Sequence, residues 1–345
     1  MLPHGARDLG RVHVDDYNVE LRDNGAFLGD QANKKSFQAI LDRWRNGLGD
    51  ADPLPDIPTK ELYSRKQELE SILLRGDPIA AGVLLGAIEE FSQSLRDVIG
   101  RFLHVAAWRD TERIVVGGGL REGRIGELVI GRTAVLLRDS GRAVDLRPVR
   151  HHPDAAGLIG SIELAPQWTR SRFDGILAVD IGGTNIRTGI VEFGPDPGAA
   201  KVRKLDRWRH ADDEPARDEA VDELIGILRK LIEAAQAEAF RLAPFIGIAC
   251  PGMIRAGGTI ERGAQNLPGD WESEDFNLPA RILAALPRIH GEPTVVTMHN
   301  DAVVQGLSEA HLMRDVTRWG VLTIGTGLGN AHFTNLAQRD DQRRG

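Results

Sequence analysis

The spacing of apolar residues divides the chain into helical and extended segments. Apolar side chains that recur every three or four positions predict helices with one buried face, and they do so at 36–47, 59–75, 78–104, 218–240, 278–286 and 302–312. Short apolar runs bounded by turn residues predict strands at 113–116, 176–179, 245–249, 294–298 and 321–324. Because strands and helices alternate over much of the chain, we predict an α/β fold.

The segment around which the pattern is organised spans residues 174–193, DGILAVDIGGTNIRTGIVEF. An apolar run ends in Asp180, Gly182 and Gly183 form a turn, and a second β-rich run returns, so the segment predicts a hairpin. Glycines let backbone N–H groups approach phosphate oxygens, the Thr184 hydroxyl adds a donor, and a carboxylate can hold the waters of Mg²⁺. An ordinary hairpin whose glycines serve only the turn is the alternative, and the full string DIGGTNIR favours phosphate binding.

Two more glycine-rich turns follow predicted strands. Strand 113–116 runs into Gly117, Gly118 and Gly119, and strand 321–324 runs into Gly325, Thr326 and Gly327. Glycines after a buried strand let a ligand or another backbone pass close to the turn. A flexible loop is an equal alternative for the first turn, whereas the second is of the phosphate-binding kind.

A carboxylate and an amide end another predicted strand. Residues 294–298 lead into Asn300 and Asp301, and a helix begins there. Asp301 could act as a general base, because a strand-to-helix junction is a rigid platform for one. It could equally be the N-cap of the helix, which needs no substrate. The sequence leaves both interpretations open.

Composition narrows the class of protein. The chain has 345 residues, 41% hydrophobic and 27% charged, which is typical of a soluble protein with two ordinary domains. A formal charge of −7 argues against a general binder of nucleic acid or anionic membranes. No apolar run approaches a membrane span or a signal peptide, so a cytoplasmic location is expected. The single cysteine, Cys250, excludes a cysteine-rich structural zinc site.

Five motifs together resemble the ROK family of sugar kinases and regulators, within the actin, hexokinase and Hsp70 ATPase superfamily. They are VDIGGTNIRTGIVEF, IACPGMI, QNLPGDW, HNDAVVQGLSE and LTIGTGLG, in the family's order between about 174 and 335. The resemblance implies a two-lobed actin-like ATPase (ribonuclease H-like) fold with a cleft between the lobes.

The adenosine-side segments stand in an unusual place. RIVVGGGL and DAAGLIGSIELA precede the first phosphate motif, whereas in the family their counterparts follow the second. A circular permutation explains this order, with the usual termini joined near 165–174. The large lobe would then comprise 1–150 and 301–345, and the small lobe 151–300. The alternative is an unrelated helical N-terminal domain fused to a truncated kinase.

The resemblance implies an ATP-dependent carbohydrate kinase that uses ATP and Mg²⁺ and binds a small sugar. Asp301 would be the catalytic base; Asn300, Asn266 and His13 would bind the sugar; and Asp180 would hold Mg²⁺ through water. The nucleotide would be bound by Asp180, Gly182, Gly183, Thr184, Asn185, Gly325, Thr326, Gly327, Gly117, Gly118 and Gly119. A homodimer is possible, and no nucleic-acid or membrane partner is expected.

Two features of the family are missing. The cysteine-rich zinc motif is absent. The sugar-binding Glu-x-x-His pair is matched only in part, by DLGRVHV, which offers Asp8 or His13 at a different spacing. A sugar-binding regulator without catalysis therefore stays an alternative. So does a kinase of a non-sugar acceptor or a nucleotide hydrolase, because a shared fold does not fix the reaction.

Overall fold

A computed structural model describes residues 2–336. The chain is a mixed α/β protein with several sheets, which confirms the predicted α/β class. It divides into two compact units: the first comprises 2–18, 154–318 and 330–336, and the second 19–153 and 319–329. This division groups residues 2–18 and 301–318 with the first unit, whereas the sequence analysis assigned them to the large lobe. The predicted lobes stay a prediction.

The first unit is built on a five-stranded sheet with the order β13-β10-β7-β8-β9. Its strands are β7 (Gly175–Ile181), β8 (Ile186–Glu192), β9 (Lys201–Trp208), β10 (Leu242–Cys250) and β13 (Val295–Asn300). β7, β10 and β13 are parallel, whereas β8 and β9 run antiparallel to their neighbours. The predicted hairpin is therefore β7 and β8.

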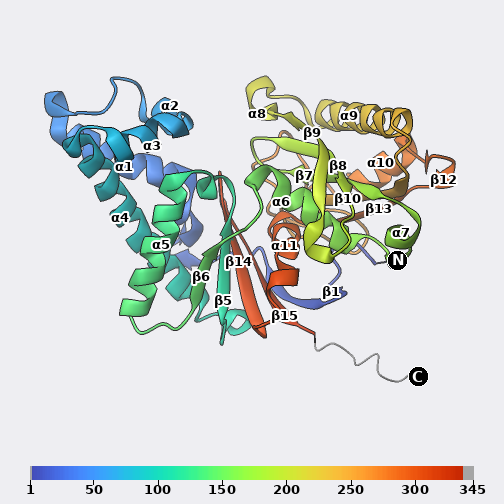
Figure 1. Cartoon of the computed structure of the whole chain (residues 1–345), viewed down its shortest axis with the longest axis horizontal. Coiled ribbons are helices and arrows are strands. Elements are labelled where there is room, and N and C mark those ends of the chain that lie inside the picture. The colour runs from blue at the N-terminus through green and yellow to red at the C-terminus, as the bar shows by residue number, and fades with distance from the viewer. Residues whose placement is uncertain (1, 337–345) are drawn as a thin grey trace. The chain divides into compact units, whose positions relative to one another are not determined.

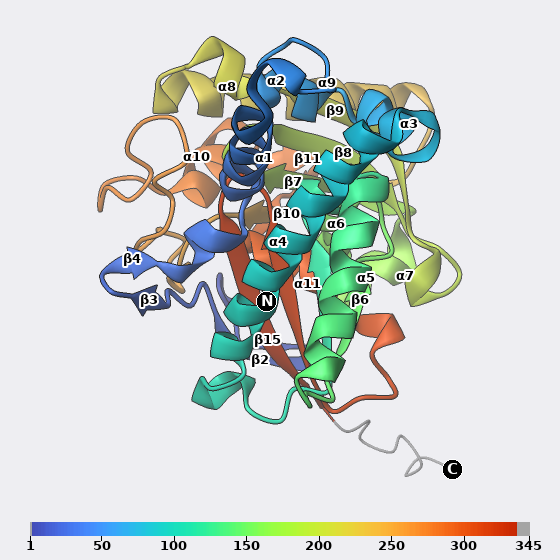
Figure 2. The same cartoon turned by 90° about the vertical axis from the view of Figure 1, so that its left-hand side faces the viewer.

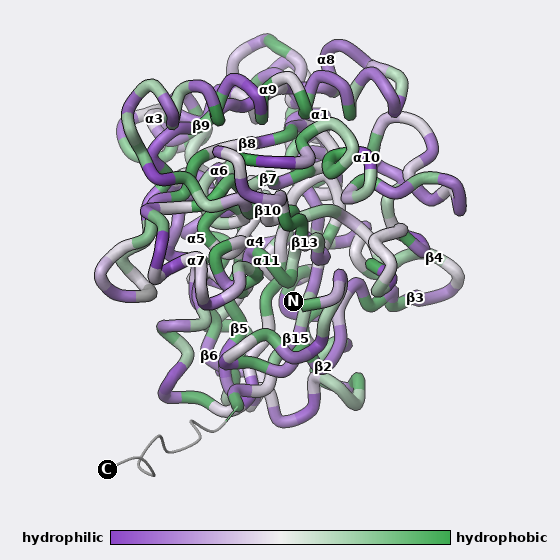
Figure 3. Tube along the Cα trace, turned by 90° about the vertical axis from the view of Figure 1, so that its right-hand side faces the viewer, coloured by the Kyte–Doolittle hydropathy of each residue, from purple (hydrophilic) through white to green (hydrophobic). Residues whose placement is uncertain are grey.

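Two helices cover one face of this sheet. α9 (Arg217–Ala237) lies over β8 and β10, and α10 (Leu278–Ala285) lies beside β13 (Figure 1). Their apolar side chains share one core with Leu177, Val179 and Ile181 of β7. Figure 3 shows α9 changing between hydrophilic and hydrophobic segments, as expected for a helix that buries one side.

The other face is covered by α6 (Pro153–Gly160), the 3₁₀ helix η5 (Ser161–Leu164) and α11 (Asp301–Leu307). Glycine lets these backbones approach closely. A Cβ on Gly160 would lie 1.7 Å from the Val304 carbonyl oxygen, and one on Gly157 would lie 2.6 Å from Cγ of Asp180. The segment DAAGLIGSIELA thus lies in α6 and η5, and its glycines allow this close packing.

The first unit also contains a set of antiparallel strands. β2 (Val12–Tyr17) pairs with β1 (Asp8–Leu9) on one side and with β15 (Leu328–Asn335) on the other. The remaining short elements of this unit are α7 (Gln167–Arg172), η6 (Pro197–Ala199), α8 (His210–Asp213), β11 (Arg288–Ile289), β12 (Glu292–Pro293) and η7 (Ala310–Leu312).

The second unit combines three parallel strands with a group of helices. β5 (Arg113–Gly117) lies between β14 (Arg318–Ile324) and β6 (Asp145–Pro148). The long helix α4 (Pro78–Phe102) runs between α1 (Lys34–Leu48) and α5 (Arg124–Asp139), as Figure 2 shows. The other elements are β3 (Arg22–Asp23), β4 (Ala26–Phe27), η1 (Leu28–Ala32), η2 (Gly49–Ala51), α2 (Thr59–Ser64), α3 (Lys66–Arg75), η3 (Ala106–Trp108) and η4 (Gly119–Arg121).

Two predicted helices are shorter than expected. The helix predicted at 59–75 breaks between α2 and α3, because Arg65 leaves the helical region with φ −90° and ψ 64°. The helix predicted at 302–312 ends at Leu307, where the Ser308 hydroxyl donates to the Gln305 carbonyl at 2.7 Å and competes with the helical ladder.

Within residues 2–336, no single helix has the length and apolar character needed to cross a bilayer. One pair, α3 and α4, passes that test together but is bent by 117° at its break.

Candidate active site

Polar residues gather where the parallel strands of the first unit end. Asp180 stands near the end of β7, opposite Ala249 of β10, and Cys250 at the end of β10 stands opposite Asn300 of β13. Asp301 follows directly and begins α11. The carboxyl edge of an α/β sheet is where ligands usually bind. The fold therefore brings Asp180 to the same edge as Asn300 and Asp301, which lie far from it in sequence.

Asn300, and not Asp301, is the N-cap of α11. The Asn300 Oδ1 atom accepts from the backbone N–H groups of Ala302 at 3.0 Å and Val303 at 3.2 Å. Its Nδ2 atom donates to the Gly252 carbonyl at 3.0 Å, and the residue is 2% exposed. Because Asn300 already accepts hydrogen bonds from the N–H groups of the first turn of α11, Asp301 is not required as the N-cap.

Asp301 lies in an electrostatic environment suited to a base. Burial, helped by the charge of Asp180, raises the pKa of the Asp301 carboxyl from 3.8 to about 7. Its Oδ1 atom accepts from the Ala302 N–H at 2.9 Å, which opposes that rise. A pKa close to neutral is the value at which a carboxylate exchanges protons most effectively at physiological pH.

Cys250 is a buried thiol at the same edge. Burial, with the charges of Asp301 and Asp180, raises its pKa well above the ordinary value. A thiol that stays protonated is a poor nucleophile. The burial and raised pKa of Cys250 therefore favour a packing role over that of a nucleophile.

Asp180 is held by a network that the sequence analysis did not identify. Arg187, its cross-strand partner in the hairpin, places Nη1 3.4 Å from Oδ2 of Asp180 and Nε 2.5 Å from Oδ1 of Asp154. Asp154 also accepts from Nη1 of Arg207 at 3.2 Å. Burial raises the pKa of Asp180, and the charge of Arg187 opposes that rise. Hairpin register could have identified Arg187, since the strands join at a short turn, but nothing in the sequence indicated Asp154.

The turn of the hairpin has a compact geometry. The Gly182 N–H donates to the Asn185 carbonyl at 2.9 Å, and the Thr184 carbonyl accepts from Ala211 at 3.3 Å. Asn266 packs against the turn, since a Cβ on Gly183 would lie 2.9 Å from the Asn266 Cβ. The structure thus places Asn266 next to Gly183, and the predicted roles of the residues of this turn stay predictions.

The two other glycine turns lie side by side in the second unit. Strands β14 and β5 are parallel, with Thr323 opposite Gly117, so the turns that follow them meet at one edge. A Cβ on Gly118 would lie 2.5 Å from the Ile324 carbonyl oxygen. In contrast, no heavy atom lies within 4 Å of a Cβ built on Gly119 or Gly325. On the Cβ side of Gly119 and Gly325 there is therefore space for an approaching group.

His13 has its own partner. On β2, its Nδ1 atom lies 2.7 Å from Oδ1 of Asp8 on β1, where the two residues are directly paired across the strands. Asp8 and His13, the partial match to the family's acid and histidine, thus contact each other. The sugar-binding role of His13 stays a prediction.

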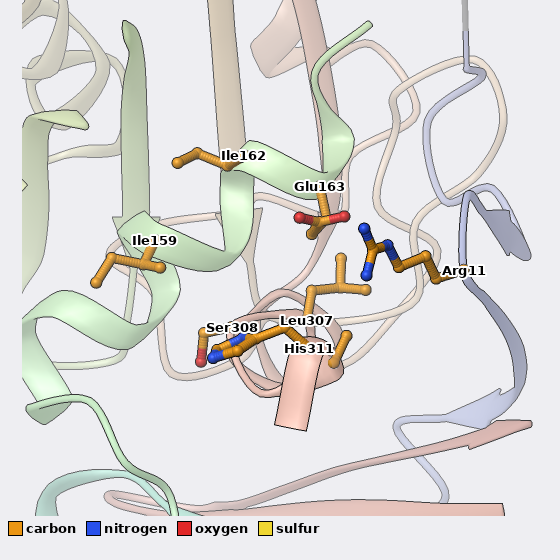
Figure 4. A pocket seen from close by; sticks show the side chains of 8 residues that line it. Arg11, Ile159, Ile162, Glu163, Leu307, Ser308 and His311 are labelled. Atoms are coloured by element: carbon orange, nitrogen blue, oxygen red, sulfur yellow. The ribbon is translucent and has the colours of Figure 1, made fainter. Parts of the chain in front are cut away.

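A small pocket lies at the opposite end of α11 from Asp301. It is lined by Arg11, Ile159, Ile162, Glu163, Leu307, Ser308, Ala310 and His311. The side chains of Arg11 and Glu163 point toward one another across it (Figure 4). Neither Asp180 nor Asp301 lines this pocket.

Among residues 2–336, no group of three or more histidine, cysteine, aspartate or glutamate side chains is arranged to hold a metal ion. The chemistry of the donors still suits Mg²⁺ bound through water. The charge of Asp180 raises the pKa of Asp301, and the charges of both carboxylates raise the pKa of Cys250, so a cation bound here would relieve repulsion.

No protein-family model matches the sequence, and no curated protein is significantly similar to it. Solved structures do match. One is a putative sugar kinase from Cytophaga hutchinsonii, at 19% identity and a TM-score of 0.36, covering 47% of this chain and 48% of that one. Another is a putative N-acetylmannosamine kinase from Listeria monocytogenes, at 26% identity and a TM-score of 0.35, covering 47% of each chain.

A third is a ROK family transcriptional regulator, described as a homologue of the Escherichia coli MLC protein, at 18% identity and a TM-score of 0.35, covering 49% of this chain and 43% of that one. This chain thus spans about half the length of each of the three. They are proteins of the kind that the sequence resembles. At TM-scores below 0.5, such alignments do not indicate what this chain binds.

Proposed function

We propose that the protein transfers a phosphoryl group from ATP to a hydroxyl of a sugar. The observation that carries the proposal is the placement of Asp301. It stands at the carboxyl edge of parallel strands, free of the capping role, with a pKa raised to about 7. The charge of Asp180, which lies at the end of β7 before the predicted phosphate-binding turn, contributes to this rise in pKa.

In the proposed reaction, Asp301 accepts the proton of the sugar hydroxyl while the hydroxyl oxygen attacks the γ-phosphorus and ADP leaves. Asp180, fixed by Arg187, orients waters at the phosphates, and Asn266 and His13 bind the sugar. The backbone of Gly117–Gly119 and of Gly325–Gly327 binds the nucleotide. Mg²⁺, when bound, neutralises the negative charge that develops on the phosphates. Positioning and charge neutralisation carry most of such a reaction, so few side chains suffice.

The test is phosphoryl transfer from Mg·ATP to a panel of hexoses, amino sugars and polyols. Wild type is compared with Asp301→Asn and with Asp275→Asn, which removes an exposed carboxylate of the same unit. We expect turnover on one class of sugar, a loss of at least a hundredfold in Asp301→Asn, and normal turnover in Asp275→Asn. Normal turnover in Asp301→Asn would refute the assignment.

One observation favours a second candidate, a sugar-binding regulator without catalysis. Both ends of the Asn300 amide are engaged by the protein, through Ala302 and Val303 on one side and Gly252 on the other. A side chain used in this way contributes less to positioning a substrate. Sugar binding measured by calorimetry, together with no phosphoryl transfer to any sugar of the panel, would support the regulator.

A further inference from the structure

The start of α1 is fixed against the Gly325 turn. The Lys34 backbone N–H, at the first helical position, donates to the Gly325 carbonyl at 2.9 Å. Asn33, which is 3% exposed, caps the helix, and its side chain and that of Ser36 form a reciprocal capping box. The turn is itself closed by a hydrogen bond of 2.9 Å from the Gly325 N–H to the Gly327 carbonyl. Lys34 therefore has a fixed position beside this turn.

An aromatic ring supports the Lys34 side chain. Its Nζ atom lies 5.3 Å from the centre of the Tyr63 ring, within the range of a cation–π contact. Tyr63 is buried, and burial raises the pKa of its hydroxyl, so the ring stays neutral. An ammonium group carries its charge at the end of a flexible four-carbon stem. The ring thus helps to hold a positive charge near the beginning of α1.

The backbone of Lys34 stands at the edge where both glycine turns end. Gly118 packs on Ile324, the residue before Gly325, and there is empty space on the Cβ side of Gly119 and Gly325. Lysine is a common partner of phosphate oxygens, acting as a compact point charge. The positive end of the α1 dipole adds to the same field.

We propose that Lys34 binds the diphosphate of the nucleotide held at Gly325–Gly327, with Tyr63 as its support. The inference rests on the proposed function and adds a residue that the glycine motifs do not contain. It assigns Lys34 to the phosphates rather than to the base or the ribose, since the residue is attached to the turn that follows β14.

The test compares binding of Mg·ADP and of AMP to the full chain by calorimetry. Lys34→Met removes the charge and keeps an apolar stem. Lys35→Met is the matched control, because Lys35 is the next residue of the same helix and is exposed. We expect Lys34→Met to weaken Mg·ADP binding about ten- to a hundredfold and AMP binding less than threefold. Lys35→Met should bind both as wild type does, and Lys34→Arg should recover part of the loss.

Three other outcomes would contradict the inference or the proposed function. Unchanged Mg·ADP binding in Lys34→Met overturns the inference, as does an equal loss for AMP and Mg·ADP, which would place Lys34 near the adenosine. No nucleotide binding to the wild type would overturn the proposed function together with this inference. Lys34→Gln, with its melting temperature compared with that of wild type, distinguishes lost binding from lost folding.

Discussion

The carboxylate of Asp301 should lower the stability of the folded protein while it serves the reaction. A carboxyl whose pKa rises on folding binds its proton more tightly in the folded state. Folding then costs nothing extra below the unfolded pKa, and the cost grows as the pH rises toward the folded pKa. For Asp301 that window runs from 3.8 to about 7. Replacing it with asparagine, which is neutral and of the same shape, should remove the cost.

The magnitude follows from the width of that window. Each pH unit between the unfolded and folded pKa is worth about 1.4 kcal/mol. The Asp301 carboxyl therefore lowers the free energy of unfolding by about 4 kcal/mol at pH 8 and by about 1.5 kcal/mol at pH 5. Asp301→Asn should therefore raise the free energy of unfolding, and by about 2.5 kcal/mol more at pH 8 than at pH 5. The same variant should be inactive, because an amide cannot accept the hydroxyl proton.

Urea denaturation of wild type, Asp301→Asn and Asp275→Asn at the two pH values, with Mg²⁺ chelated, measures this difference. The surface variant should follow wild type at both values. Turnover of the wild type should rise with pH through about 7, because only the ionised base accepts a proton. The reasoning is refuted if Asp301→Asn is less stable than wild type at pH 8, or if its advantage does not grow with pH.

Three further substitutions test the geometry. Gly325→Ala places its Cβ in open space and should keep its melting temperature but weaken Mg·ADP binding at least tenfold in calorimetry; Gly131→Ala, also in open space but within α5, should bind normally. Gly157→Ala places its Cβ 2.6 Å from Cγ of Asp180 and should reduce kcat at least tenfold in steady-state assays. Arg187→Met removes the cation paired with Asp180 and one of two arginines paired with Asp154, and should cost about 3 kcal/mol in urea denaturation; a loss below about 1 kcal/mol would contradict the network.

The sequence predicts most of the strands and the helices because their apolar patterns are strong. The long helix α4 and the hairpin β7–β8 are clear cases. The sequence-based prediction is wrong where a side-chain hydrogen bond competes with the helical ladder and ends a helix, as the bond from the Ser308 hydroxyl does after Leu307. Apolar periodicity carries no information about such hydrogen bonds.

The candidate site shows a similar limit. Asp180 and the glycine turns stand out because each follows an apolar run. Asp154 does not stand out, because it lies on a helix 26 positions before Asp180 and is linked to it by Arg187, which contacts both carboxylates. Networks of this kind depend on tertiary packing between segments whose spacing in sequence has no rule.

The order of the segments remains best explained by a circular permutation, which we retain as a proposal. β2, near the start of the described chain, pairs antiparallel with β15, near its end. The Leu336 N–H then donates to the Arg11 carbonyl at 2.8 Å. An independent N-terminal domain is expected to have its own core, and not to pair its strands with strands from the other end of the chain.

Asn300 and Asp301 show how the structure decides between two functions of one motif. Both side chains can cap a helix, and in the sequence they are adjacent, so either could take the position. In the fold, Asn300 ends β13 with a buried amide that reaches both the first turn of α11 and the Gly252 carbonyl, which a carboxylate could not do because it has no donor. Asp301 is left one residue further on, with its charge near that of Asp180 and no capping role. Burying a carboxylate is costly, and perturbed carboxylates gather at functional sites. The proposed function therefore assigns Asn300 a structural role as the cap of α11 and Asp301 the role of the base, a proposal that the activity of Asp301→Asn tests.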